Sequence, residues 1–262
     1  MHLSHAIFLF FAAIIAGTLN SIAGGGSFVS FPAMLFTGMP PVEANATNTV
    51  ALWPGLAAGT LAYVKLLNAP GRLLVPLLLA SVAGGVAGAL LLIKTPPHTF
   101  MHLVPWLLLG GTLLFAFGNR IRAMAGHSAA SDDLLHTSWR AITIASLLQL
   151  TVGIYGGYFG AGIGFVMLGM FTALGMRDLH SMNAFRTLLA AVINAAAVVM
   201  FIAAGAVLWL QCLTMMAGAL LGGWFGARYA QKADPKKLRV LVICVGIVLS
   251  VYFFVRIYIM AV

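Results

Sequence analysis

The chain has 262 residues, of which 62% are hydrophobic and 7% charged, and its mean hydropathy is +1.04. A soluble domain carries about 25% charged residues and about 45–50% apolar ones, and a chain of this length could not bury so much apolar surface in water. The composition therefore excludes a soluble protein and predicts an integral membrane protein. The net charge of +9 is expected from Lys and Arg in cytoplasmic loops. Binding to nucleic acid is a less suitable explanation, since no basic face typical of a nucleic-acid-binding module is visible.

Ten apolar runs follow one another along the chain and predict an all-α, polytopic membrane protein. A spanning helix needs about 20 apolar residues, and two of the runs are shorter because they adjoin glycine clusters. Proline-containing breaks separate several of the others. In chain order the runs are Ala6–Ala23, Ser27–Met39, Thr47–Val64, Leu73–Ile93, Leu103–Phe117, Trp139–Tyr155, Phe159–Met176, Leu188–Leu210, Gln211–Ala227 and Leu238–Ile259.

The long polar stretch in the chain, Gly118–Ser138, is typical of a linker between two halves. It predicts a first membrane repeat over residues 1–119, a cytoplasmic linker over 120–138 and a second membrane repeat over 139–262. A constant offset of 138 relates the halves, and this many matches at one offset indicate a duplication. The matching pairs are Gly24 and Gly162, Gly26 and Gly164, Asn45 and Asn183, Thr49 and Thr187, Gly84 and Gly222, Gly88 and Gly226, Lys94 and Lys232, and Pro97 and Pro235.

The basic residues favour two repeats of opposite orientation. If each half has five membrane segments, beginning with a two-limbed hairpin around its glycine cluster, the second half is inverted relative to the first. With the N-terminus outside, only Lys94 and Arg256 then face outward, which satisfies the positive-inside rule. Inverted repeats place a binding site near the membrane midplane, where broken helices meet. The predicted inner-face residues are Lys65, Arg72, Arg120, Arg122, Arg140, Arg177, Arg186, Arg228, Lys232, Lys236, Lys237 and Arg239.

The glycine clusters are the first candidate site. Successive glycines expose backbone N–H groups and permit positive φ, and a helix starting beside them would direct its positive dipole end and unpaired N–H groups at an anion. The alternative is close helix packing through small residues, which we favour for Gly84, Gly88, Gly222 and Gly226. The candidate binding residues are Asn20, Ser21, Gly24, Gly25, Gly26 and Ser27 in the first cluster and Tyr155, Tyr158, Gly160, Gly162 and Gly164 in the second.

A polar motif after each cluster is the second candidate. Amides and hydroxyls inside a membrane helix need a partner, either a neighbouring helix or a ligand. Under the offset, Asn48 corresponds to Arg186, whose guanidinium could hold an oxyanion through two hydrogen bonds. The alternative for Arg186, which we weigh equally, is a side chain that extends to the inner headgroups. The candidate residues of this motif are Asn45, Thr47, Asn48, Asn183 and Arg186.

Nothing in the sequence predicts catalysis, a metal ion or another cofactor. The histidines lie mostly at termini and in loops, at spacings that suit no metal site, and no hydrolase or nucleotide-binding motif is present. The predicted membrane segments contain no acidic residue that could form a carboxylate relay for proton transport, because all the acidic residues fall in predicted loops. These residues are Glu43, Asp132, Asp133, Asp178 and Asp234.

Several motifs recur together along the chain. They are Gly17–Ser27, Phe31–Leu35 and Ala44–Asn48, the Gly-x-Tyr-x-Gly-x-Phe-Gly pattern from Gly153, and the glycine-rich Leu221–Arg228. These motifs resemble those of the TauE/SafE family of sulfite exporters and probable membrane transporters. The resemblance implies export of sulfite or of a small organosulfur or carboxylate anion. Many relatives carry a proline where this chain has Met170, a difference that bears on the substrate more than on the fold.

These observations together predict a secondary transporter in the cell inner membrane. A small anion would bind near the midplane between the two glycine tips. The alternative is a membrane scaffold or accessory protein without transport, which the polar groups at symmetric motifs disfavour. The sequence leaves the substrate, the coupling ion and the oligomeric state open, a homodimer included.

Overall fold

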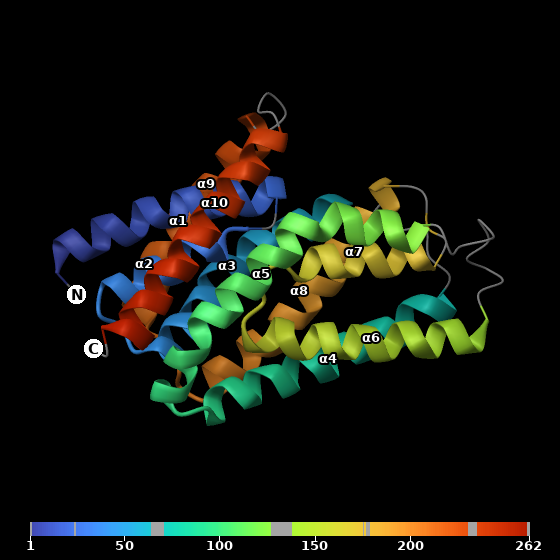
Figure 1. The fold of residues 1–262 in the computed structure, drawn as a ribbon, viewed down its shortest axis with the longest axis horizontal. Coiled ribbons are helices and arrows are strands. Elements are labelled where there is room, and N and C mark those ends of the chain that lie inside the picture. The colour runs from blue at the N-terminus through green and yellow to red at the C-terminus, as the bar shows by residue number, and fades with distance from the viewer. Residues whose placement is uncertain are drawn as a thin grey trace.

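The computed structural model describes residues 2–23, 25–63, 71–126, 138–174, 176, 179–229 and 235–260, and within these ranges every regular element is a helix (Figure 1). The α-helices are α1 (Leu3–Ala23), α2 (Ser27–Phe36), α3 (Pro41–Tyr63), α4 (Gly71–Lys94), α5 (Pro97–Gly126), α6 (Trp139–Tyr158), α7 (Ile163–Ala173), α8 (Leu179–Ala203), α9 (Trp209–Tyr229) and α10 (Pro235–Phe254), and a π-helix (Val255–Ile259) follows α10.

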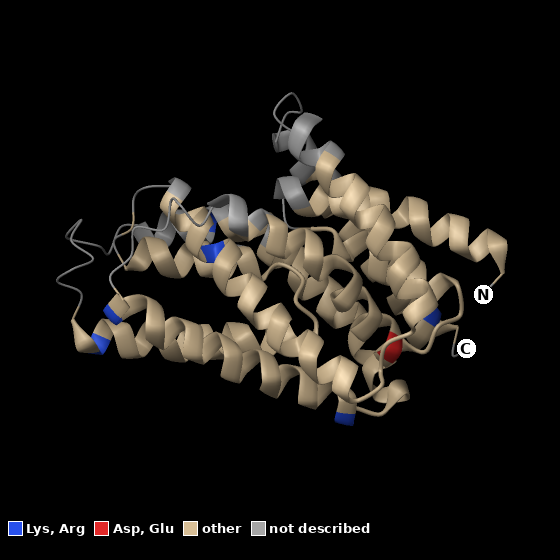
Figure 2. Cartoon of the chain, turned by 180° about the vertical axis from the view of Figure 1, so that it is seen from behind, with Lys and Arg blue, Asp and Glu red and all other residues tan. Residues whose placement is uncertain are grey.

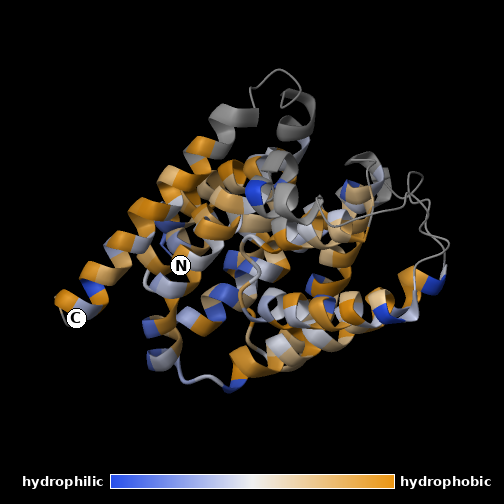
Figure 3. Cartoon of the chain, turned by 45° about the vertical axis from the view of Figure 1, so that its right-hand side comes forward, coloured by the Kyte–Doolittle hydropathy of each residue, from blue (hydrophilic) through white to orange (hydrophobic). Residues whose placement is uncertain are grey.

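Six of these helices are long and apolar enough to cross a membrane, so the protein is a multi-pass membrane protein. The spans lie at Leu3–Asn20, Gly71–Lys94, Pro97–Gly118, Trp139–Tyr158, Ser181–Ala203 and Val242–Ile259, and α2 is a shorter apolar helix. Hydrophobic residues lie along most of the helices (Figure 3), and many large ones are exposed on the outside of the bundle. On α1, for example, Phe8, Phe11 and Ile15 form an exposed stripe at helical spacing. Such a surface is stable only against lipid.

Three helices extend six residues or more beyond the predicted apolar runs at one end or both. Helix α3 begins at Pro41, so Glu43 lies in its first turn and not in a loop, where its carboxylate complements the positive end of the helix dipole. Helix α5 continues to Gly126, into the predicted linker, whose residues 127–137 lie outside the described ranges. Helix α8 begins at Leu179 and therefore includes Asn183 and Arg186. An apolar run marks only the buried or lipid-facing part of a helix, and polar turns can extend it at either end.

The two halves of the chain interleave, because the closest helix pairs combine one helix from each half. Helix α1 packs along α9, and α4 packs along α6. Glycines permit the close approach: a Cβ atom added to Gly222 would overlap the carbonyl of Ile14, and one added to Gly88 would overlap the carbonyl of Ile154. Gly84 likewise packs against the backbone of Gly153. The packing interpretation of Gly84, Gly88 and Gly222 is therefore confirmed. The surroundings of Gly226 lie outside what the structure describes.

Helices α3 and α8 cross in the centre of the bundle. The indole Nε1 of Trp53 donates to the carbonyl of Ala191 at 3.1 Å, and the hydroxyl of Thr60 donates to the carbonyl of Thr187 at 3.2 Å. From the first contact to the second, the residue number increases on α3 and decreases on α8, so the two helices are antiparallel. Trp53 and Ala191 differ by 138, the repeat offset.

The described basic residues outside the centre separate to two ends of the molecule (Figure 2). At one end Arg72 lies over the ring of Trp139, with 4.1 Å between its guanidinium carbon and the ring centre, and Arg140 is adjacent in the chain. Lys94 ends α4 toward the other end, and Arg256 lies in the π-helix near the C-terminus (Figure 1). The beginning of α1 and the end of the π-helix share this second end (Figure 1).

Candidate functional site

The first glycine tip joins α1 to α2. Gly26 precedes α2 with φ −58° and ψ −38°, ordinary helical values, so the positive φ that a glycine permits is not used at this position. Glycine is required here because there is no room for a side chain. A Cβ atom would overlap the carbonyl of Ala16 and lie 3.1 Å from the Cβ of Asn20. Gly24 lies outside the described residues, and Ser21 is described only by its backbone in α1.

The N-terminus of α2 points into the bundle. Gly25 and Gly26 are buried, and the carbonyl of Gly26 accepts the N–H groups of Val29 and Ser30 at 3.0 and 3.1 Å. Gly26 has no side chain with which to cap the helix. The first N–H groups of α2 and the positive end of its dipole are therefore directed at the tip, an arrangement that favours an anion.

Two amides of α3 face this region and have different roles. Asn45 is 1% exposed, and its Nδ2 donates to the carbonyl of Tyr158 at 2.9 Å, which ties α3 to the end of α6. Asn48 is 2% exposed, and its Nδ2 lies 3.4 Å from the hydroxyl of Ser27 in the first turn of α2. The Oδ1 of Asn48 is buried and has no hydrogen-bond partner among the described residues. Because the Ser27 hydroxyl can donate or accept, the amide can turn and present its NH₂ group instead.

Two predicted site residues direct their side chains elsewhere. The buried hydroxyl of Thr47 accepts the N–H of Leu208 at 3.0 Å and so faces the connection between α8 and α9. The hydroxyl of Tyr158 donates to the Thr95 hydroxyl at 3.4 Å, and its ring packs against Phe100. Tyr158 therefore reaches the Asn45 amide only through its backbone carbonyl.

The second glycine tip joins α6 to α7 and uses the positive φ that glycine permits. Gly160 and Gly162 have φ of +82° and +83°, values that L side chains rarely adopt, so glycine is required here for conformation. The hydroxyl of Tyr155 donates to the carbonyl of Ala161 at 2.9 Å and braces the turn from within. Helix α7 begins at Ile163 with Gly162 at its N-cap, again without a side-chain cap.

Arg186 lies against the first turn of α7. A Cβ atom added to Gly164 would be 3.0 Å from the Cδ and 3.3 Å from the Nη1 of Arg186, so this glycine makes room for the arginine. The half-buried Arg186 thus occupies, at α7, the place that Asn48 occupies at α2. Asn183 is also half-buried, and within the described part of the chain it makes no bond equivalent to that of Asn45.

Helix α5 brings the two tips close together. A Cβ atom added to Gly111 would lie 3.0 Å from the Cζ of Phe28 in α2 and 3.1 Å from the Cβ of Ala161 in the second tip. The rings of Phe31 and Phe159 meet edge to face with 5.5 Å between their centres. Sequence reasoning missed Gly111, although a Gly-Gly dipeptide inside an apolar run was a usable signal.

The N-termini of α2 and α7 face one another across the crossing of α3 and α8. Each short helix returns alongside the helix that follows it, with Ser27 beside Asn48 and Gly164 beside Arg186. Because α3 and α8 are antiparallel, α2 and α7 are antiparallel too. At 1.5 Å per residue, the two central contacts place Asn48 and Arg186 roughly 15–20 Å apart along the helix axes, on opposite sides of the crossing.

The arrangement is suited to anions more than to metal ions. Among the described residues, no group of three or more His, Cys, Asp or Glu side chains could hold a metal ion. The groups that converge on the tips are backbone N–H donors, amides and one guanidinium. They can hold an anion by hydrogen bonds in a region of low dielectric constant, where such bonds are stronger than in water.

The chain is similar to membrane transporters over nearly its whole length. The family described as "Sulfite exporter TauE/SafE" matches residues 9–253. A "Probable membrane transporter protein ORF9" of Sinorhizobium sp. is 35% identical over 93% of this chain and 90% of its own length. The "Probable membrane transporter protein YfcA" of Escherichia coli K12 is 28% identical over 92% and 87%, and a "Probable membrane transporter protein" of Haemophilus influenzae is 27% identical over 92% and 91%. No solved structure matches the chain.

Proposed function

Because the chain belongs to the sulfite exporter TauE/SafE family, which is a family of transporters and not of enzymes, we propose that it carries a small anion across the cell inner membrane. Sulfite or an organosulfonate or carboxylate of similar size is the substrate class. The anion binds near the membrane midplane, in the space between the two glycine tips, and moves from one tip to the other.

The facing N-termini of α2 and α7 are the observation that carries this proposal. Both helices begin inside the bundle without a side-chain cap, so both direct positive dipole ends and N–H groups at the space between them. Arg186 adds a full positive charge on the α7 side, and its planar guanidinium suits an oxyanion. On the α2 side, the Asn48 amide has a buried end without a described partner, and a bound ligand would satisfy it.

Two inverted repeats account for this symmetry. The contact between Trp53 and Ala191, which are related by the repeat offset, lies where a two-fold axis would pass. The antiparallel crossing of α3 and α8 supports an axis in the membrane plane, since an axis along the membrane normal would make them parallel. The interleaved pairs α1 with α9 and α4 with α6 correspond to one another under the same operation.

The charge distribution supports an orientation with both termini outside. Arg72 and Arg140 lie in the first turns of α4 and α6, which begin at the end opposite the termini, and α5, which carries Arg120, also ends on that side (Figure 1). The positive-inside rule therefore favours that end as the cytoplasmic one. An anion that leaves a negative-inside cell gains about 2.3 kcal/mol per charge for each 100 mV. Export therefore has a driving force without a coupled cation.

Proteoliposomes that contain the purified protein and a sulfite-sensitive dye test the proposal. We expect sulfite flux above that of empty vesicles, and competition by small sulfonates or carboxylates. Gly25→Leu, which places a side chain at the α2 tip, should abolish flux while the protein still inserts. Gly55→Leu is the matched control, because a Cβ atom at Gly55 meets no neighbouring atom within 4 Å. Absence of flux for every anion in the wild type would favour a membrane scaffold or accessory protein.

A further inference from the structure

Helices α4 and α6 run side by side in the same direction and both begin with an arginine. The guanidinium of Arg72 lies over the ring of Trp139, and further along the pair the Nε2 of Gln149 donates to the hydroxyl of Ser81 at 2.8 Å. Residue numbers increase from the first contact to the second on both helices, so the helices are parallel. Arg72 precedes Ser81 by nine residues, and Arg140 precedes Gln149 by nine. The two arginines therefore lie side by side at the same level.

This level is that of the lipid headgroups. The two candidate membrane spans concerned are Gly71–Lys94 and Trp139–Tyr158, so each arginine is the second residue of its span. From Arg72 to Lys94, α4 is about 33 Å long at 1.5 Å per residue, slightly more than a hydrocarbon core about 30 Å thick. Trp139 is 64% exposed, and exposed Trp is typical of the membrane–water interface.

Each arginine also ends a stripe of lipid-facing side chains on its own helix. Val75 and Leu79 on α4 and Ile144 and Leu147 on α6 are between 54% and 65% exposed. They follow the arginine of their helix by three and seven residues on α4 and by four and seven on α6, so they share its face. Lipids whose acyl chains lie against these stripes therefore have their headgroups beside the arginines.

The positive charge at this level is not balanced by the described residues. Arg72 and Arg140 are exposed, and within the described ranges neither guanidinium has an ion-pair or hydrogen-bond partner. Of the five acidic residues of the chain, the structure describes Glu43 alone, on α3. Trp139 covers one face of the Arg72 guanidinium, which leaves the N–H donors at its edge available for an anion.

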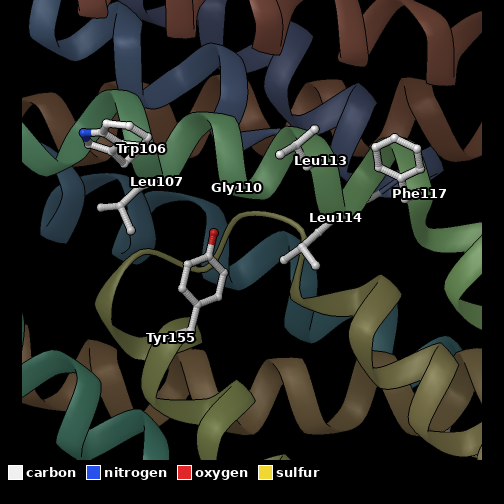
Figure 4. A pocket seen from close by; sticks show the side chains of 7 residues that line it. All are labelled: Trp106, Leu107, Gly110, Leu113, Leu114, Phe117 and Tyr155. Carbon is white, nitrogen blue, oxygen red and sulfur yellow. The ribbon is translucent and has the colours of Figure 1, made fainter.

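An apolar cavity beside Tyr155 illustrates what the arginines add. That cavity has a volume of about 400 Å³ and lies between Tyr155 and the part of α5 from Trp106 to Phe117 (Figure 4). None of the described residues that line it is charged, so it has no means of selecting one lipid from another. Two adjacent guanidiniums do select, because they attract a phosphate and repel the ammonium group of a zwitterionic lipid.

We propose that Arg72 and Arg140 form a binding site for the headgroup of one anionic phospholipid, in the leaflet at the end opposite the termini. The phosphate oxygens accept hydrogen bonds from both guanidiniums, and the acyl chains lie along the exposed stripes of α4 and α6. Since α4 belongs to the first half of the chain and α6 to the second, the bound lipid connects the two halves. The site does not depend on the proposed anion transport.

Native mass spectrometry of the intact protein tests the assignment. The protein is titrated in detergent with phosphatidylglycerol and with phosphatidylethanolamine of the same acyl chains. We expect the first phosphatidylglycerol to bind at least about fivefold more tightly than the first phosphatidylethanolamine. Glycerol phosphate, which has a phosphate but no acyl chains, should not displace the lipid at about tenfold excess, because it lacks the contact with the stripes.

The double variant Arg72→Gln/Arg140→Gln should weaken the binding of phosphatidylglycerol at least about fivefold and leave that of phosphatidylethanolamine unchanged. Lys94→Gln/Arg256→Gln is the matched control, since it removes the same charge from residues outside the site. Its affinity for phosphatidylglycerol should stay within about twofold of the wild type. Arg140→Gln alone, which removes no described contact and so keeps the fold, should weaken this binding at least about twofold.

Four results would overturn the assignment. The first two are equal affinity of the wild type for both lipids, and undiminished affinity for phosphatidylglycerol in either glutamine variant of the site. The third is an equal loss in the Lys94→Gln/Arg256→Gln control, which would indicate an effect of net charge without a site. The fourth is displacement of the lipid by glycerol phosphate, which would identify a soluble phosphate as the ligand.

Discussion

The two glycine tips occupy equivalent places in the fold but use glycine for different reasons. At the first tip, Gly26 has helical φ and ψ and is needed because α1 passes too close for a side chain. At the second tip, Gly160 and Gly162 have positive φ and are needed for the shape of the turn itself. The same residue type is therefore required by close packing at one tip and by backbone conformation at the other.

The polar partners of the tips differ as well. Asn48 is neutral and lies against the first turn of α2, whereas Arg186 lies against the first turn of α7 and is charged. Since roughly 15–20 Å separates the two along the helix axes, a small anion cannot contact both at once. Under the proposed function, this difference predicts that the Arg186 tip binds the anion tightly and that the Asn48 tip releases it.

Gly162→Ala should have the largest effect, because it breaks the second tip in two ways. An L residue in the left-handed region costs roughly 1–2 kcal/mol, and the new Cβ atom would lie 2.9 Å from the carbonyl of Gly111. We expect loss of sulfite flux and a lower unfolding temperature in detergent. Gly205→Ala is the control for conformation alone, since Gly205 also has positive φ, at +67°, but open space around it. Equal effects of the two variants would show that the contact with α5 is unimportant.

Asn45→Leu should have the next largest effect, and mainly on stability. The substitution leaves the carbonyl of Tyr158 without its donor at a buried position, at a cost of about 1–3 kcal/mol. Because this bond joins the first half of the chain to the second tip, flux should fall with it. Urea unfolding of the reconstituted protein measures the loss. An unchanged midpoint would mean that the two tips are held together without Asn45.

Thr47→Val should have the smallest effect of these three substitutions. The variant keeps the shape of the side chain and loses the acceptor for the N–H of Leu208, worth about 1 kcal/mol. The hydroxyl faces away from both tips, so the substitution should lower the stability of the fold and leave anion binding unchanged. Sulfite flux should therefore stay within about twofold of the wild type. A much larger fall in flux would indicate that the Thr47 hydroxyl does line the anion path.

The sequence predicted the helical class, the glycine tips and the asymmetry between Asn48 and Arg186, because these depend on hydropathy, glycine clusters and one constant offset. It could not predict which way a polar side chain turns. Asn45 and Thr47 are two residues apart on α3, yet one bonds to the second tip and the other to the α8–α9 connection. Gly111 was missed because its role arises only when α5 packs against both tips.

Sulfite affinity and turnover, measured in parallel for Arg186→Gln and Asn48→Leu in the same liposomes, test the central claim most directly. If the charged tip holds the anion, Arg186→Gln should weaken equilibrium binding at least about tenfold, or roughly 1.4 kcal/mol, and Arg186→Lys should restore only part of it. Asn48→Leu should fold normally, keep affinity within about threefold, less than 1 kcal/mol, and lower turnover instead. Equal losses of affinity in the Gln and Leu variants, or no loss in either, would contradict a division of roles between the two tips.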